Sequence, residues 1–271
     1  MKLLAKFNLI FILVMALGVA VSGWISHGLL QAQAREEVVG TGRLMMEKAL
    51  AVRSYTTNHI AKLLQTQMQY EFLPQSVPSF SATEVLSTLQ KSYPQFGYKE
   101  ATLNPTNPRD RAVDWEVDIV NSFRSNAELK ELVGVRDTPT GASLYVARPL
   151  RITNPACLQC HSSVEAAPKT MVEKYGPANG FGWQLNEVVG AQVVSVPMEL
   201  PLKRANDNFK LFISALIGVF VVVGIVLNLM IWTVVVRPVT QLSELADRVS
   251  QGDLAAPEFS TSGKDEIAVL A

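Results

Sequence analysis

The stretch ELVGVRDTPTGASLYVARPLRI (residues 131–152) decides the fold that the rest of the chain must satisfy. Two runs rich in valine, leucine and tyrosine flank Pro139 and Gly141, which are residues typical of a tight turn. Strands joined by so short a turn run antiparallel. A hairpin alone is only marginally stable in water, so it needs further strands or a helix against its apolar face. We therefore expect an antiparallel sheet at the centre of the domain.

Further strands are predicted on both sides of this hairpin in the sequence. GFGWQLNEVVGAQVVSVPM (180–198) ends in a run of β-branched residues, and FGYKEATL (96–103) is a shorter segment of strand-forming residues. The sheet should then have about four strands, with a long loop between the second strand of the hairpin and the last strand of the domain.

Helices are predicted before the sheet. Apolar residues recur at three- and four-residue steps from Leu29 to about Phe72, which indicates one long helix. Ser81 and Glu84 form a capping-box pattern at the start of a second helix, and Pro94 ends it.

Two shorter helices are predicted within the sheet-forming part of the chain. Residues 112–125 alternate as a strand would, but the length of this segment and Pro108 near its start favour a helix. Residues 167–176 favour a short helix that ends on Gly176. Together with the predicted strands, these helices give an α+β fold.

Two uncharged apolar segments lie outside this domain. The first runs from Phe7 to Ile25 and the second from Leu211 to Val236, and a membrane-spanning helix needs about 20 apolar residues. Hydrophobic residues make up 48% of the 271-residue chain, which agrees with a membrane protein. The 24 basic and 24 acidic side chains balance, so no basic stripe indicates a nucleic-acid partner.

The first apolar segment has two interpretations. Lys2 and Lys6 before it, and AQA at residues 32–34 after it, are also features of a cleaved secretory signal. Its length, and the distance of the small residues from its apolar part, favour an uncleaved anchor. Lysines before the first segment, and Arg237 and Arg248 after the second, place both ends in the cytoplasm by the positive-inside rule. The intervening domain should then be periplasmic or otherwise extracytoplasmic.

The motif NPACLQCHS (154–162) contains the only two cysteines of the chain, Cys157 and Cys160, and His161 follows directly. The pattern C-x-x-C-H is typical of covalent c-type haem attachment. Its two thiols add to the two vinyl groups of one porphyrin, and the adjacent histidine becomes the proximal iron ligand. A structural zinc wants four protein ligands, and a redox dithiol of the thioredoxin type follows a strand rather than an Asn-Pro turn. A small disulfide remains the plain structural alternative.

Several motifs together resemble a known family. They are AVRSYTTNHI, YKEATLNPTNPRDRAVDWE, RDTPTGASLYVARPL, NPACLQCHS and GFGWQLNEVVGAQVVSVPM, and they cover roughly residues 40 to 200. They are similar to outward-facing c-type haem sensor domains with a PAS-like fold, formerly catalogued as a domain of unknown function. The resemblance implies a membrane span, a HAMP relay and an output domain after the sensor.

The C-terminal segment resembles a HAMP module. Pro238 starts a new helix, and Leu242, Leu245 and Val249 recur at coiled-coil spacing. An ordinary amphipathic helix next to the membrane is the simpler alternative. Residues 265–267 would start the second HAMP helix close to the last residue, Ala271, so we expect the output on a cytoplasmic partner or on a longer form of the protein. The expected segments are an N-terminal anchor at 1–28, a haem domain at 29–208, a second span at 209–236 and a partial HAMP relay at 237–271.

The sixth iron ligand is the least determined part of the predicted site. In a relative of the family a cysteine on the N-terminal helix binds the iron, but this chain has no third cysteine. His59 on the predicted long helix is the candidate, with an open or water-bound iron as the alternative. Arg109 and Arg111 are candidates for the haem propionates. Five methionines are rival ligands, namely Met45, Met46, Met68, Met171 and Met198.

These observations predict a receptor rather than an enzyme. One covalently bound haem c would detect redox state or a diatomic gas outside the cytoplasm, and the HAMP helix pair would relay the change across the lipid bilayer. A homodimer is expected, because one apolar coiled-coil stripe needs a partner. The alternative is a membrane-anchored monohaem cytochrome that transfers electrons, which would need an anchor but no relay.

Overall fold

The computed structural model describes residues 3–139 and 141–252. These residues form two compact units. Ala32–Arg204 make up one unit, and the segments before Ala32 and after Arg204 make up the other. Helix α1 (Leu3–Tyr55) has residues in both units.

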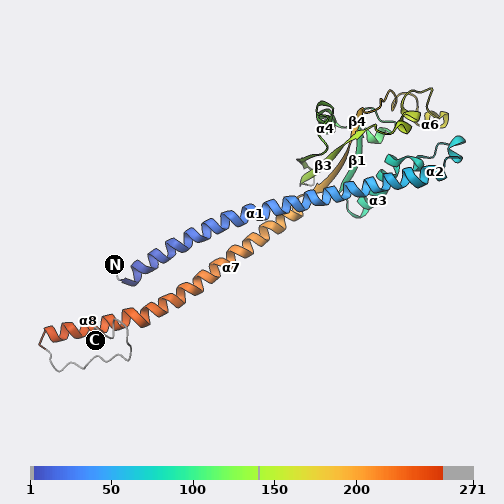
Figure 1. Cartoon of the computed structure of the whole chain (residues 1–271). Helices are drawn as coiled ribbons and strands as arrows, with labels where there is room; N and C mark the ends of the chain where they lie inside the picture. The colour runs from blue at the N-terminus through green and yellow to red at the C-terminus, as the bar shows by residue number, and fades with distance from the viewer. Residues whose placement is uncertain (1–2, 140, 253–271) are drawn as a thin grey trace. The chain divides into compact units, whose positions relative to one another are not determined.

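The first unit is built on a four-stranded antiparallel sheet (Figure 1). The order across the sheet is β1-β4-β3-β2, so the last strand of the sequence lies between the first and third. The register pairs Val194 of β4 with Val146 of β3 and with Tyr98 of β1. The expectation of an α+β fold with an antiparallel sheet of about four strands is confirmed. The strands are β1 (Gly97–Thr102), β2 (Leu132–Thr138), β3 (Gly141–Arg151) and β4 (Val188–Pro197).

The central position of β4 follows from its composition. Every residue from Val188 to Val194 is buried, whereas the edge strand β2 has no buried residue and contains Arg136 and Asp137. Charged residues on an edge strand discourage pairing with other chains. At Gly190 the neighbouring strand β1 comes so close that an added Cβ would lie 2.3 Å from the carbonyl oxygen of Ala101. Only glycine fits between the two strands at this point.

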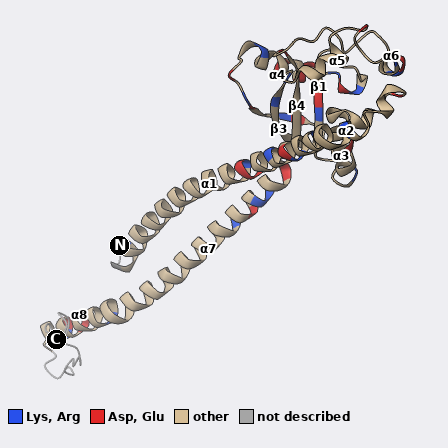
Figure 2. Cartoon of the chain, turned by 45° about the vertical axis from the view of Figure 1, so that its right-hand side comes forward, with Lys and Arg blue, Asp and Glu red and all other residues tan. Residues whose placement is uncertain are grey.

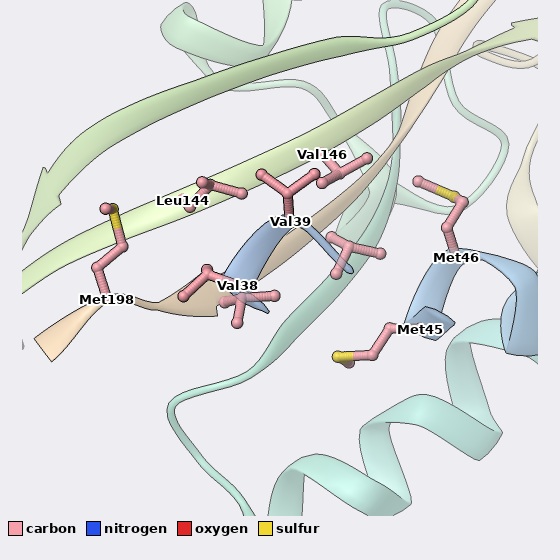
Figure 3. Packing of buried hydrophobic residues seen from close by; sticks show 9 residues of the cluster. Val38, Val39, Met45, Met46, Leu144, Val146 and Met198 are labelled. Atoms are coloured by element: carbon pink, nitrogen blue, oxygen red, sulfur yellow. The ribbon is translucent and has the colours of Figure 1, made fainter. Parts of the chain in front are cut away.

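Both faces of the sheet are covered by helices. Alternate residues of a strand point to opposite faces, so Val194 and Val196 pack toward α1, whereas Val193 packs toward α4 (Asp114–Ser125). Figure 3 shows the α1 side, where Val38 and Met46 of the helix contact the sheet. The buried residues of this cluster are Val38, Val39, Met45, Met46, Leu144, Val146, Val194, Val196 and Met198.

The segment 112–125 resolves as a helix, as its length favoured. Helix α4 buries Ile119, Val120 and Phe123 against the sheet. The side chain of Glu116 accepts a hydrogen bond from the backbone N–H of Val113 at 3.0 Å and caps the first turn. The hairpin around Pro139 and the helix that ends on Gly176 are also confirmed. This last helix is α6 (Lys169–Tyr175), and Gly176 follows it with a φ of +82°.

The predicted start of the second helix was wrong. Helix α3 (Pro78–Ser92) begins at Pro78, and Ser81 lies inside its first turn. The Ser81 hydroxyl donates to the backbone oxygen of Gln75 at 3.0 Å instead of capping the helix. Proline is favoured in the first turn because it lacks the N–H that would be left without a partner there.

The N-terminal helix is longer than its predicted range and ends in a different geometry. α1 passes without a break from the apolar segment into the domain, because no proline interrupts it. The regular α-helix ends at Tyr55, where the backbone changes to a π-helix and then to short helical turns. The part of the predicted helix between Tyr55 and about Phe72 is therefore a series of short elements. They are η1 (Thr56–Ile60), α2 (Ala61–Leu63), η2 (Gln67–Gln69) and η3 (Pro74–Ser76).

Two helices of the chain are long and apolar enough to cross a membrane, and their apolar segments lie in the second unit. No Lys, Arg, Asp or Glu lies between Lys210 and Arg237, and the part of helix α7 (Glu199–Ile231) after Lys210 is uniformly tan in Figure 2. Within this unit Asn8 and Asn228 exchange side-chain hydrogen bonds of 2.9 and 2.7 Å. The C-terminal helices are α7 (Glu199–Ile231), η6 (Trp232–Val236) and α8 (Arg237–Ser250).

Helix α8 has proline in its first turn, as Pro238 predicted, and Gly252 follows its end with a φ of +91°. The second HAMP helix expected at residues 265–267 lies outside the described residues.

Candidate functional site

A cavity of about 560 Å³ lies inside the Ala32–Arg204 unit. It is walled by the end of α1, the π-helix η1, strand β1, helix α6 and the loop that carries the two cysteines. Two short 3-10 turns also contribute, η4 (Pro108–Asp110) and η5 (Pro155–Cys157). The lining residues with polar or sulfur groups include Arg53, Met68, Glu100, Thr106, Arg109, Asp110, Cys157, Cys160, His161, Met171, Tyr175 and Trp183.

The two cysteines are held by a capped turn. The side chain of Asn154 accepts a hydrogen bond from the N–H of Ala156 at 2.9 Å, and its carbonyl accepts one from Cys157 at 3.1 Å. Cys157 ends η5, and Cys160 lies in the single turn α5 (Leu158–His161). The two thiols are not bonded to each other, and both line the cavity. Burial raises the pKa of both thiols, although the nearby Arg53 opposes this for Cys157, so both stay protonated at neutral pH.

One ring nitrogen of His161 is held by a hydrogen bond, and the other has no hydrogen-bond partner among the described residues. Its Nδ1 lies 2.7 Å from the carbonyl oxygen of Gly180, so Nδ1 carries the hydrogen and donates it. The ring stacks on Trp183 with 3.9 Å between centroids and 14° between planes. Burial lowers the pKa of His161, which keeps the ring neutral. Among the described residues none forms a hydrogen bond with Nε2, so this nitrogen has a free lone pair.

Only glycine fits at position 180. Its φ is +87°, and an added Cβ would lie 2.9 Å from the Cα of Thr106 and closer still to the Thr106 hydroxyl. Two backbone bonds tie the following residues to the histidine loop. Gly182 N–H donates to Ser162 at 3.1 Å, and Trp183 N–H donates to His161 at 3.1 Å. The loop at 180–183 therefore sets the orientation of the imidazole.

A buried ion pair forms another part of the wall. Arg53 of α1 donates from one nitrogen to both carboxylate oxygens of Glu100, at 2.6 and 2.5 Å. Glu100 also accepts a hydrogen bond of 2.7 Å from the hydroxyl of Tyr98, which accepts one of 3.1 Å from Gln192. Burial raises the pKa of Tyr98, so the phenol stays protonated and remains a donor. These bonds compensate the charge of the Glu100 carboxylate.

A second group of charges lies on η4. Arg109 forms an ion pair with Glu84 of α3, and its guanidinium lies over the ring of Phe80 at 4.9 Å. Asp110 is 3.6 Å from Arg109. Burial raises the pKa of Asp110 to about 6, with Arg109 opposing the shift.

The cavity brings together four of the six predicted site residues: Cys157, Cys160, His161 and Arg109. Arg111 does not line it, and its guanidinium donates to the side chain of Asn179 at 3.2 Å. His59 does not line it either.

The side chain of His59 is exposed on η1, with its ring 5.1 Å from that of Tyr55. Its neighbours Thr57 and Ala61 do line the cavity, so the helix turns its other face inward at this point. Of the five rival methionines, Met68 and Met171 line the cavity. Met45, Met46 and Met198 belong to the hydrophobic core.

Sequence reasoning missed several residues of the site. Arg53, Glu100 and Asp110 lie far from the cysteines in sequence, and only the fold brings them to the cavity. Gly180 and Trp183 carried a weak signal, because GPANGFGW (176–183) places three glycines shortly after the C-x-x-C-H motif. Such a density of glycine is typical of a loop with positive φ angles.

The fold and the cavity define a class of protein: an α+β domain, with a cavity lined by two thiols and an imidazole, in a chain with two helices of membrane-spanning length. Residues 31–197 match the family model Tll0287-like, described as Tll0287. The match covers more than half of the chain, so the chain belongs to the Tll0287-like family. Residues 231–271 match the HAMP domain. With its candidate spans, the chain is a membrane protein of the signalling type.

A solved structure is also similar to this chain, described as the crystal structure of the cyanobacterial heme-protein Tll0287. The two are 18% identical, with a TM-score of 0.47, and the similarity covers 59% of this chain and 95% of that chain. No curated protein matches.

Proposed function

We propose that this protein is a membrane receptor in which one covalently attached haem c detects redox state or a diatomic gas outside the cytoplasm. The observation that carries the proposal is the geometry of His161. Its Nδ1 is bound to the carbonyl of Gly180, its Nε2 is free, and two unpaired thiols share the cavity with it. A histidine that donates one ring N–H to a backbone carbonyl presents the other nitrogen as a metal ligand.

The residues of the cavity fit a c-type haem. Cys157 and Cys160 would each form a thioether with one vinyl group of the porphyrin, and His161 would provide the proximal ligand. Arg109 lies on the wall as a cation for the propionates, and its pairing with Glu84 holds it there. Arg111 is the second propionate candidate, although it faces Asn179 in this structure. A bound haem supplies an iron centre that changes oxidation state or binds a gas. The family also takes its name from Tll0287, a protein described as a heme-protein.

The relay is proposed to start at the N-terminal helix. Arg53 and Ser54 of α1 line the cavity, and the same helix contains the first candidate span. A state of the cofactor that favours one arrangement of the cavity wall would shift the equilibrium between two positions of α1. The HAMP match at 231–271 favours this receptor over a membrane-anchored electron carrier, which would not need a relay. Positively charged residues at both ends support a cytoplasmic location for both termini.

Covalent attachment is tested by haem staining after denaturing electrophoresis of the full chain, expressed with the c-type maturation machinery. The wild type should stain, and Cys157→Ser/Cys160→Ser should not. His161→Ala should keep the thioethers but lose the proximal base, so its spectrum should change while the stain remains. An unstained wild-type chain that is folded and inserted in the membrane would exclude the proposal.

The sixth ligand is identified by three single alanine variants, at His59, Met68 and Met171. His59 was predicted from the sequence, and the two methionines line the cavity. Replacement of the true ligand should convert a low-spin spectrum to a high-spin one that binds carbon monoxide readily. A histidine ligand also predicts a lower reduction potential than a methionine ligand. If all three variants match the wild type, water or no ligand occupies the sixth position.

A further inference from the structure

We propose that Asp110 is a proton-exchange site coupled to the oxidation state of the cofactor, so that the reduction potential of this receptor depends on pH. The inference rests on the proposed haem, because it assigns to a residue of the cavity a role toward that group. It depends on how the charges of the cavity wall are paired.

Two carboxylates line the cavity among the described residues, Glu100 and Asp110, and their surroundings differ. Glu100 is 2% exposed and accepts two charge-assisted hydrogen bonds from Arg53 and one from Tyr98. The negative charge of Glu100 is therefore compensated by these three hydrogen bonds.

The negative charge of Asp110 is less well compensated than that of Glu100. Its side chain is 20% exposed, and its nearest cation is Arg109 at 3.6 Å, a distance beyond a normal hydrogen bond. Arg109 also donates a hydrogen bond from its Nη1 to the carboxylate of Glu84 in α3, so it does not serve Asp110 alone. Asp110 therefore keeps a carboxylate that is partly removed from water and only partly neutralised.

The other charged groups around Asp110 are already engaged. Lys99 of β1 donates to Glu116 and to the backbone oxygen of Arg111, both at 2.7 Å, and so acts on Asp110 only from a distance. The guanidinium of Arg111 donates to Asn179. Tyr175 of α6 also faces this group, and its own pKa is raised by burial.

Burial raises the pKa of Asp110 to about 6, and the negative charge of Glu100 adds to the rise. The group is therefore near half-protonation at mildly acidic pH before any cofactor charge is considered. An extra electron in the same cavity adds negative charge, which raises the pKa of a neighbouring carboxyl further.

The coupled step balances as one electron and one proton. With a haem bound, reduction of its iron by an external one-electron donor would be accompanied by the transfer of one proton from the solvent to the Asp110 carboxylate, which would become a carboxylic acid. Reoxidation by an external acceptor would return that proton to the solvent. Between the pKa values of Asp110 in the two states, the reduction potential should fall by up to about 59 mV per pH unit, the constant for one electron and a tenfold change.

The test is a potentiometric titration of the full chain in detergent, with dithionite and mediator dyes, between pH 4.5 and pH 8.5. The wild-type potential should fall with rising pH, and Asp110→Asn should remove most of this slope. Asp118→Asn is the matched control, because Asp118 is an exposed aspartate of α4 outside the cavity, and it should keep the wild-type slope.

A second measurement keeps the test valid if Asp110→Asn does not fold. In the wild type, the infrared difference spectrum between reduced and oxidised protein should contain a protonated carboxyl band that shifts in deuterated water. Its absence would overturn the inference. An unchanged slope in a folded, haem-stained Asp110→Asn protein would assign the proton to a propionate instead and would also overturn it. A chain without haem would overturn the proposed function, which is a separate outcome.

Discussion

At the scale of single residues, one glycine determines the orientation of the His161 imidazole. Gly180→Ala would push a Cβ into Thr106 and would also strain a φ of +87°. We expect this variant to lose about 1–3 kcal/mol of stability and to displace the carbonyl that holds Nδ1 of His161. The measurement is the thermal midpoint together with the haem spectrum.

Gly182→Ala provides the matched control for this variant. Gly182 has a similar φ of +81°, but no atom lies within 4 Å of its added Cβ. It should therefore show the backbone strain without the displacement of His161. If both variants change the spectrum equally, the contact with Thr106 is not what fixes the imidazole.

Asp110 should also make the stability of the folded domain depend on pH. Its pKa is raised from 3.8 to about 6 in the folded state, so the favourable contribution is present below pH 4 and is lost as the pH rises through 6. Asp110→Asn removes the buried charge and should stabilise the haem-free protein by about 2 kcal/mol at pH 7. This value follows from about 1.4 kcal/mol per unit of pKa shift, reduced because the side chain is partly exposed. Thermal unfolding at pH 4 and pH 7 measures this. A gain of equal size at both pH values would contradict the linkage.

At the scale of elements, the buried ion pair joins α1 to β1. Arg53→Met would leave the Glu100 carboxylate, whose side chain is 3% exposed, without its cation. We expect a loss of about 3 kcal/mol, because removal of one partner leaves an uncompensated buried charge. The double variant Arg53→Met/Glu100→Gln should recover much of this loss, which thermal unfolding of the three proteins would reveal.

Arg43 of the same helix offers a matched control. It pairs with Glu131, but its own side chain is 52% exposed. Arg43→Met should therefore cost less than about 1 kcal/mol, as is usual for exposed pairs. Equal losses for the Arg43 and Arg53 variants would mean that the Glu100 pair adds nothing special to the join between α1 and β1.

The sequence predicts elements well where local chemistry determines them. Pro139 and Gly141 place the hairpin, and Gly176 ends its helix, because turn and cap residues act within a few positions of the chain. The start of α3 was missed because two local signals compete there. Ser81 and Glu84 form a capping pattern, yet Pro78 starts the helix and Glu84 binds Arg109 instead.

The site was predictable only in part for a related reason. The motif at residues 157–161 contains its chemistry within five positions, so Cys157, Cys160 and His161 could be named from the sequence. The placement of His59 depends on which face of η1 points inward, and the π-helix changes the periodicity on which such an argument relies. Asp110 and Glu100 reach the cavity through the packing of the sheet, which no local pattern encodes.

At the scale of the whole molecule, the proposed relay would need a second copy of the chain. Leu242, Leu245 and Val249 follow one another on one face of α8, and Val249 is 48% exposed. A coiled-coil stripe of this kind is buried against an equivalent stripe of a partner helix, and residues 231–271 match the HAMP domain. A parallel homodimer would cover these residues on both copies.

Cysteine cross-linking in membranes tests this dimer. Single cysteines at Leu242 and Val249 should form disulfide-linked dimers on mild oxidation, because equivalent positions of a parallel pair lie close to the shared axis. Glu244→Cys is the control, since Glu244 lies on the opposite face of α8 at the helical spacing of 100° per residue and should cross-link poorly. Haem-stained protein should be used, because the proposed thioethers would keep Cys157 and Cys160 from reacting. Equal cross-linking at all three positions would indicate random collision, and no cross-link at Leu242 or Val249 in haem-loaded protein would refute the dimeric relay.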